Sequence, residues 1–114
     1  MRTAHWFIAL AATLPLAAAH AEVDKKTERT WKTKCASCHG VDGKGMTDQG
    51  TKMGIADYTA PAWQKSKTDA ELKKGITDGV SREKNGKKQE MDPFKDKLSP
   101  EQVDQLTAFI RALV

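Results

Sequence analysis

The most constraining feature of this chain is a five-residue stretch in which Cys35, Cys38 and His39 form the pattern C-x-x-C-H. Two thiols three positions apart lie near one face of a helical turn, so both can reach the same molecule. The imidazole that follows can reach a metal from the same side. This pattern is typical of covalent haem attachment. We therefore expect Cys35 and Cys38 to hold one c-type haem through thioether bonds, and His39 to be an axial ligand of its iron.

The first 21 residues have the features of a secretory signal peptide. Arg2 precedes an apolar run at 7–19, and a small-x-small motif ends at Ala21, as signal-peptide cleavage requires. The apolar run is shorter than the roughly 20 residues that a membrane-spanning helix needs. We therefore predict a signal peptide at 1–21, a single domain at 22–114, export to the periplasm, and no stable membrane insertion after cleavage.

Composition indicates a domain that depends on a cofactor. The expected mature chain has 93 residues, of which 29, about 31%, are apolar; globular domains have about 45–50%, a share that also counts glycine. A chain this short, with so few apolar residues, buries too small a core unaided, and an enclosed haem would supply the missing apolar mass.

The charge of the expected mature chain is only mildly positive. Its 18 basic and 15 acidic residues are interspersed and give a net charge of +3. This is unlike the strong positive field of a nucleic-acid binder, so we expect no nucleic-acid partner.

Three helices can be predicted from the sequence. The first runs from about Asp24 into Cys35. The second opens with a capping box at Thr68 and stops at Gly79. The third begins after Ser99, which is followed by proline at the first helical position. Its apolar stripe comprises Val103, Leu106, Ile110 and Leu113, with Phe109 beside it. No segment shows the alternation of a β-strand. We therefore expect an all-α domain of about three to four helices wrapped around one covalently bound haem.

The segments between these helices are expected to be irregular. The glycine-rich stretch at 40–54 indicates tight turns or a close approach of the backbone to a flat group. A phosphate-binding loop fits less well, because no strand precedes the stretch and no G-K-[ST] follows at the right spacing. Residues 57–63 are expected to form a loop. The polar stretch at 82–90 is expected to be a solvated turn with Asn85 and Gly86 at its tip.

The second axial position of the iron has several candidates. The expected mature chain contains no histidine except His39, which leaves Met46, Met53, Met91, a lysine or an open site. Met91 is preferred, because Pro93 stiffens the turn that follows it and Phe94 can pack near the edge of the porphyrin ring. A thioether ligand would raise the reduction potential relative to a second imidazole. Met53 is the reserve candidate. The competing interpretation is that Met91 only fills space in the core.

Several groups of residues along the chain carry a family resemblance. They are Cys35-Ala36-Ser37-Cys38-His39-Gly40, Asp42-Gly43-Lys44-Gly45, Met91-x-Pro93-Phe94, Leu98-Ser99-Pro100-Glu101-Gln102 and Leu106-x-x-Phe109-Ile110-Arg111-x-Leu113. With these groups the chain resembles the small class I cytochromes c of bacteria, periplasmic proteins with a single haem, over nearly all of 22–114. The resemblance implies crossing first and last helices, a haem in a cleft with one edge exposed, and His39 and Met91 as axial ligands. It also implies a monomeric one-electron carrier, not an enzyme, that meets redox partner proteins transiently.

The chain departs from that family's pattern in two places. The family often has a proline soon after the attachment motif, and the carbonyl of that proline orients the axial histidine. Here the first proline after His39 is Pro61, so the acceptor for the His39 ring N–H is open. The family's usual M-P-x-F pattern is changed to Met91-Asp92-Pro93-Phe94.

Other interpretations of the same residues fit less well. A structural zinc site needs four ligands, whereas Cys35, Cys38 and His39 supply three. A thioredoxin-like dithiol normally follows a strand, and a plain disulfide would leave His39 and the apolar-poor composition unexplained. A different functional class is a haem-based gas-binding or peroxide-reactive protein. That class requires an open or displaceable sixth position on the iron, which ligation by Met91 would close.

Polar residues elsewhere carry weaker signals. Tyr58 and Trp63 could donate hydrogen bonds to a haem propionate, or could simply pack within their loop. A group of lysines could steer an acidic partner, although we favour a solvated face. These are the lysines at 65, 67, 73, 74, 84, 87, 88, 95 and 97.

Overall fold

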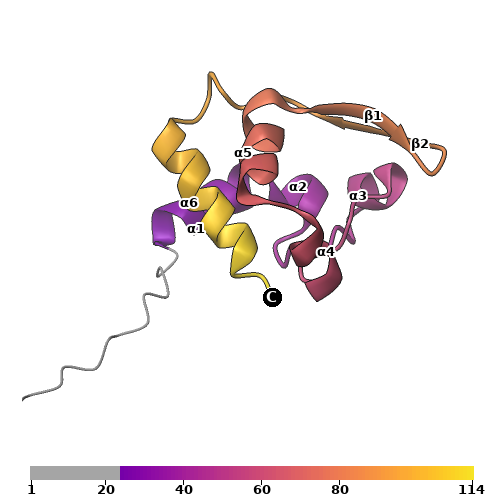
Figure 1. The fold of residues 1–114 in the computed structure, drawn as a ribbon, viewed down its shortest axis with the longest axis horizontal. Helices are drawn as coiled ribbons and strands as arrows, with labels where there is room; N and C mark the ends of the chain where they lie inside the picture. Colours follow the sequence, from indigo (N-terminus) through magenta and orange to yellow (C-terminus); the bar gives the residue numbers. More distant parts are fainter. Residues whose placement is uncertain (1–23) are drawn as a thin grey trace, which may run out of the picture.

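A computed structural model describes residues 24–114 of the chain (Figure 1). The predicted signal peptide at 1–21 lies outside the described residues. Within 24–114 the fold has six helices and one two-stranded antiparallel sheet. None of the described helices has both the length and the apolar character that crossing a bilayer requires.

Three helices build the core. Helix α1 (Lys25–Lys34) crosses α6 (Pro100–Arg111), and α5 (Asp69–Asp78) packs beside α6 (Figure 1). Trp31 of α1 is only 2% exposed, and its indole Nε1 donates to the Gly40 carbonyl at 3.0 Å. The other buried apolar side chains are Leu72, Ile76, Leu98, Val103, Leu106 and Ile110. The expected stripe on the last helix therefore faces the core, with Phe109 and Leu113 packed against it.

The helix starts and stops follow the capping signals of the sequence. Asp24 caps α1 by accepting a hydrogen bond from the Thr27 amide at 2.6 Å. Thr68 and Ser99 each form a complete capping box, at the starts of α5 and α6. Gly79 ends α5 with a φ of 75°, a left-handed conformation that suits glycine. The predicted positions of these helices are confirmed.

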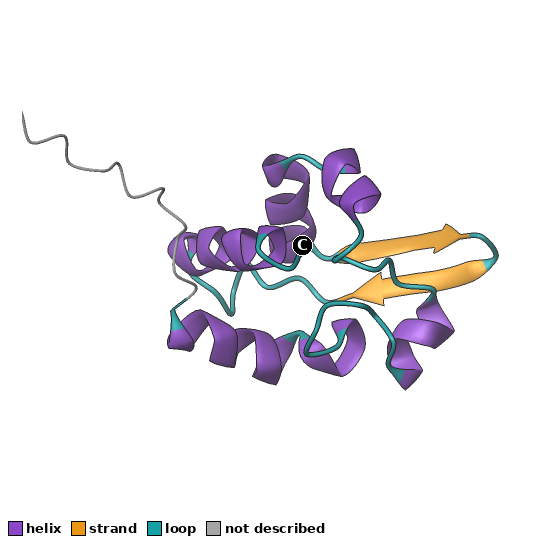
Figure 2. Cartoon of the chain, turned by 90° about the horizontal axis from the view of Figure 1, so that it is seen from below, coloured by secondary structure: helices purple, strands orange, loops and turns teal. Residues whose placement is uncertain are grey.

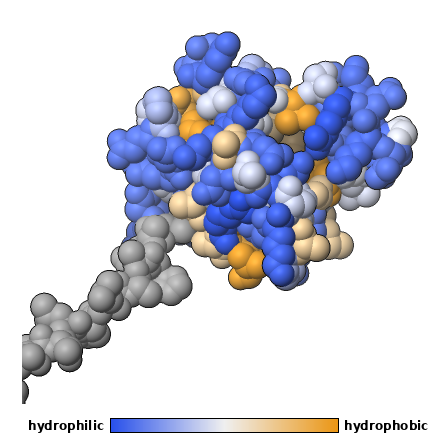
Figure 3. All heavy atoms as spheres, viewed as in Figure 1, coloured by the Kyte–Doolittle hydropathy of each residue, from blue (hydrophilic) through white to orange (hydrophobic). Residues whose placement is uncertain are grey.

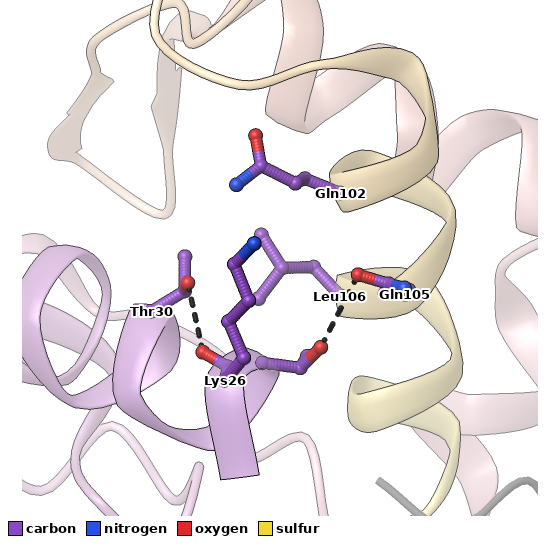
Figure 4. Close-up of a pocket in the computed structure, with 6 residues that line it drawn as sticks. Lys26, Thr30, Gln102, Gln105 and Leu106 are labelled. Carbon is purple, nitrogen blue, oxygen red and sulfur yellow. Dashed lines mark hydrogen bonds between the residues drawn. The ribbon is translucent and has the colours of Figure 1, made fainter. Parts of the chain in front are cut away.

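The crossing of α1 and α6 is partly polar (Figure 4). The Thr27 hydroxyl donates to Gln105 Oε1 at 3.5 Å across the crossing. Within α1, the Thr30 hydroxyl donates to the Lys26 carbonyl at 3.0 Å. The small pocket between the two helices measures about 10 Å³, which is at the lower limit for one water molecule. This crossing holds the fold together and offers no room for a ligand.

The attachment motif forms a short helix, α2 (Ala36–His39), as the expected helical turn. Two further short helices, α3 (Asp48–Met53) and α4 (Pro61–Ser66), occupy segments that were predicted to be irregular. The expected loop at 57–63 is therefore wrong from Pro61 onward, where proline takes the first position of α4. Helices of four to six residues are too short to show a hydrophobic period.

The polar stretch after α5 is a β-hairpin, which corrects the expected solvated turn and the purely helical domain. Strands β1 (Val80–Lys84) and β2 (Lys87–Met91) pair antiparallel. Asn85 and Gly86 connect them with φ values of 52° and 74°, the left-handed pair of a type I′ turn. The hairpin extends away from α5 toward α3 (Figures 1 and 2). Gln89 is the one residue of the two strands that is fully buried, so the hairpin has no apolar alternation from which it could be predicted.

Candidate functional site

A cavity of about 880 Å³ lies between the helices and the base of the hairpin. Its size falls within the range of small-molecule and cofactor sites. Cys35, Cys38 and His39 line it from the junction of α1 and α2, and Met91 lines it from the end of β2. The fold therefore brings together the four residues that the sequence singled out, although Met91 lies far along the chain from the other three.

The geometry of the attachment motif is set by one turn of helix. The Cys35 amide donates to the Trp31 carbonyl at 2.9 Å, and the His39 amide donates to the Cys35 carbonyl at 3.0 Å. Gly40 then turns the chain with a φ of 83°, a conformation that favours glycine. Thr47 stabilises the motif, because its hydroxyl donates to the Cys38 carbonyl at 2.6 Å.

His39 is enclosed by aromatic rings. The Tyr58 ring stacks on the imidazole with centroids 4.9 Å apart, and the Trp31 ring lies 5.8 Å away. Burial lowers the pKa of His39 to about 4, so the imidazole is neutral at pH 7, the form that binds a metal. Its buried Nδ1 has no hydrogen-bond partner among the described residues. The acceptor for the His39 ring N–H, which the sequence left open, is therefore not found among the described residues.

The two cysteines are available for covalent chemistry. Both thiols are free and half-buried at the cavity wall. Burial raises the pKa of Cys35 to about 11, and the nearby Lys34 ammonium opposes this rise. Cys35 is therefore held as a protonated, uncharged thiol at neutral pH.

The lining of the cavity fits a haem. Two thiols, an imidazole and a thioether form the donor set of covalently attached haems. Around them lies an apolar and aromatic wall that includes Trp31, Leu72, Ile76, Phe94 and Leu98. Such a wall suits the flat face of a porphyrin. The residues present therefore match the group that the motif implies.

The other methionines differ in their access to this cavity. Met53, the reserve candidate, also lines it, from the C-terminal end of α3. Met46 is 84% exposed and does not line it. The choice of a thioether ligand is thus narrowed to Met91 and Met53.

Tyr58 and Trp63 both line the cavity and stack on each other with ring centroids 4.1 Å apart. Neither the Tyr58 hydroxyl nor the Trp63 indole N–H has a hydrogen-bond partner within residues 24–114. The sequence offered a propionate contact or simple packing for these two residues. The two rings pack on each other, and the Tyr58 O–H and the Trp63 N–H each have no acceptor among the described residues.

The lysine group is mixed with acids. Lys73, Lys74 and Lys88 pair with carboxylates at distances of 3.0 to 3.2 Å. Figure 3 shows a mostly hydrophilic face on which hydrophobic residues surface only in small, separate places. Three of the nine lysines are thus paired with acids, and the two interpretations of the group, a solvated face and a surface that steers an acidic partner, stay predictions.

Two residues of the cavity wall were missed by the sequence. Arg82 and Gln89 face each other across the hairpin and both line the cavity. They were missed because their segment was interpreted as a turn. The signal that could have found them is Asn85-Gly86, since a two-residue hairpin loop at that point fixes the register and pairs position 82 with position 89.

Comparisons with known proteins agree on one family. A family model described as cytochrome c matches residues 25–113. A solved structure, KustC0563 c-type cytochrome, is 31% identical with a TM-score of 0.64, and the match covers 76% of this chain and 95% of that chain. A variant of Kustc0563 with one tyrosine replaced by phenylalanine gives 31% identity and a TM-score of 0.63, covering 77% and 98%. No curated protein matches the chain.

Proposed function

Because the chain belongs to the cytochrome c family and binds a covalently attached c-type haem, we propose that it is a monomeric, periplasmic one-electron carrier. The family's function is haem-based electron transfer, which implies redox partners. We further propose Cys35 and Cys38 as the attachment sites, and His39 and Met91 as the two axial ligands. The observation that carries this proposal is the convergence of these four side chains on one cavity.

When bound, the haem would supply an iron that can change between the ferric and ferrous states. The chain holds the ligand loop in place for that exchange. The Phe94 amide donates to the Ile76 carbonyl at 3.0 Å, and the Lys95 amide donates to the Thr77 carbonyl at 3.2 Å. The segment after Met91 is thereby tied to α5. Ligands held at fixed positions in both states keep the reorganisation small, which favours electron transfer over the binding of small molecules.

The surface supports brief contacts with redox partners. Charged residues of both signs are interspersed, and the largest exposed apolar side chains in the described part are Val41, Met46 and Val114. A surface without a large apolar patch favours transient encounters over a permanent complex. The periplasmic location rests on the signal peptide expected at 1–21.

The spectrum of the oxidised protein tests the axial ligation. We expect a sulfur-to-iron charge-transfer band in the far red and slow binding of carbon monoxide by the reduced protein. If the band were absent and carbon monoxide bound rapidly, the gas-binding or peroxide-reactive alternative would take the place of the carrier.

A substitution at Gly79 should displace Met91 without touching its side chain. A Cβ at this position would overlap the Met91 carbonyl oxygen and would lie 2.8 Å from the Pro93 nitrogen. We therefore expect Gly79→Ala to weaken the charge-transfer band while the haem remains attached. The strained φ alone costs about 1–3 kcal/mol, so the spectrum is the informative measurement.

The hairpin offers a matched control for this variant. Gly86 has a φ of +74°, almost equal to the +75° of Gly79, but no atom lies within 4 Å of an added Cβ. Gly86→Ala adds a Cβ at a positive φ without an overlap, and should keep the band. Equal spectra for the two variants would show that the Gly79 contact does not position Met91.

A further inference from the structure

The positive charge of the described residues is concentrated on helix α1. Its ten residues contain five basic side chains and a single acidic one, which gives the helix a net charge of +4. The other described residues contain 13 basic and 13 acidic side chains, so together they are neutral. One helix therefore carries the whole net charge of residues 24–114. An uneven distribution of this kind, with a basic helix, indicates contact with a polyanionic surface.

Three of these basic side chains form a row along the outside of the helix. Lys25, Arg29 and Lys32 follow one another at spacings of four and three residues, which places them on one side of a helix. Thr27 and Trp31 are buried on the opposite side, because two residues turn a helix by slightly more than half a revolution. All three residues of this basic row are exposed. Figure 2 shows α1 along one edge of the molecule, with α6 on its inner side.

Little of the charge of the basic row is neutralised within the fold. Lys32 Nζ forms an exposed ion pair with Glu28 at 3.3 Å, and an exposed pair of this kind contributes little. Lys25 and Arg29 pair with no carboxylate among residues 24–114. The row is therefore free to attract an anionic partner.

The stability of the helix does not explain these charges. The N-terminus of a helix carries a partial positive charge, so cations in the first turn weaken the helix. Lys25 and Lys26 occupy the first turn of α1, whereas Asp24 supplies the favourable charge as the N-cap. The basic residues at this end thus oppose the helix dipole, which points to a function at the surface.

The chemistry of the basic row fits lipid headgroups better than the surface of a protein. A stable protein interface has aromatic or apolar side chains at its centre. The large exposed apolar residues of the described part are Val41, Met46 and Val114, and none of them lies on α1. The row therefore offers charge alone. Basic side chains near an anionic leaflet are attracted by its surface potential and need no apolar anchor for this attraction.

We propose that the basic row of α1 binds the anionic headgroups of a lipid surface reversibly. No residue of the row lines the haem cavity, whereas Trp31 on the opposite side of α1 does. The cavity therefore stays open to redox partners while the row is on the lipid. This inference rests on the proposed function and deepens it, because a carrier held at a membrane meets membrane-bound partners by diffusion along the surface.

Co-sedimentation of the holoprotein with lipid vesicles tests the proposal. Vesicles of phosphatidylcholine and phosphatidylglycerol in equal parts are compared with vesicles of phosphatidylcholine alone. We expect binding only to the anionic vesicles, and we expect 1 M salt to abolish it because the Debye length falls to about 3 Å. Equal binding to both kinds of vesicle would overturn the proposal. Absence of binding to either kind would also overturn it, and would favour an acidic protein as the partner of the row.

The triple variant Lys25→Gln, Arg29→Gln and Lys32→Gln tests the position of the site. One basic residue near an anionic surface strengthens binding about fivefold, so the loss of three should weaken binding on the order of 100-fold. The visible spectrum of the variant should stay unchanged, because none of the three residues lines the haem cavity.

A matched triple variant separates the position of the charges from their sum. It removes three exposed lysines outside α1 that have no ion-pair partner among residues 24–114. These substitutions are Lys44→Gln, Lys65→Gln and Lys95→Gln. Charges on other faces lie beyond the screening distance from a lipid held at α1, so binding should fall by less than about tenfold. Equal losses in the two triple variants would show that only net charge matters, and would overturn the proposal.

Electron exchange with a small soluble reductant distinguishes this proposal from the carrier function. The reductant needs no membrane, so its reaction with the native protein reports on the haem alone. Normal exchange without binding to anionic vesicles would overturn the lipid site and leave the carrier function in place. Binding that depends on the basic row, in a protein that exchanges no electrons, would support the lipid site and contradict the carrier function.

Discussion

Replacing Cys35 and Cys38 together by alanine is expected to abolish the covalent holoprotein and to leave a largely unfolded chain. Both sulfurs line the cavity of about 880 Å³, and no other cysteine exists in the chain. Without the haem, the apolar and aromatic wall of this cavity would face water, which disfavours the folded state. A chain of this length with so few apolar residues has a marginal stability and little other core to offset that loss. Loss of the haem is thus expected to be loss of the fold.

The measurement is the amount of haem that stays with the denatured polypeptide, together with circular dichroism of the purified chain. Ser37→Ala is the matched control, because it changes the exposed residue between the two thiols and keeps both sulfurs. It should give normal yields of folded, coloured protein. Normal covalent holoprotein from the double variant would refute attachment at these two cysteines.

Met91→Ala is expected to leave the haem attached and to change the axial ligation and the reduction potential of its iron. The thioether favours the ferrous state, so its loss should lower the reduction potential by on the order of 100 mV, a fraction of the roughly 0.8 V that axial ligands span. The charge-transfer band should vanish, and the reduced protein should bind carbon monoxide quickly. A potentiometric titration with visible spectra measures these effects in one sample.

Two methionines serve as controls for this result. Met53→Ala changes the other thioether that lines the cavity, and Met46→Ala changes one that is 84% exposed. Both variants should keep the band and a near-normal potential. If Met53→Ala lost the band and Met91→Ala kept it, the ligand would be Met53 at the end of α3.

Much of the helical framework could be predicted because its signals are local. The capping boxes at Thr68 and Ser99 mark the starts of α5 and α6 within one residue, and Gly79 marks a stop. Each is a hydrogen-bonding rule that operates over three or four residues. The apolar stripe on α6 could also be predicted, because its twelve residues span several helical turns and show the helical period.

The hairpin could not be predicted because its stabilising contacts are distant in sequence. The buried Gln89 side chain donates hydrogen bonds to the Met53 and Gly54 carbonyls, which lie some 35 residues earlier in the sequence. A strand that buries a polar residue shows no apolar alternation. The same contact explains why Arg82 was missed, because only the register of the hairpin places it at the cavity. The motif residues could be found in advance because their chemistry, and not their packing, defines the pattern.

The most direct test is mass spectrometry of the tryptic peptide at 35–44 from protein produced in a host that attaches haem. The account predicts that this peptide carries the mass of one haem, and that fragmentation places it on Cys35 and Cys38. A colourless protein whose 35–44 peptide has the bare mass of its ten residues would contradict it.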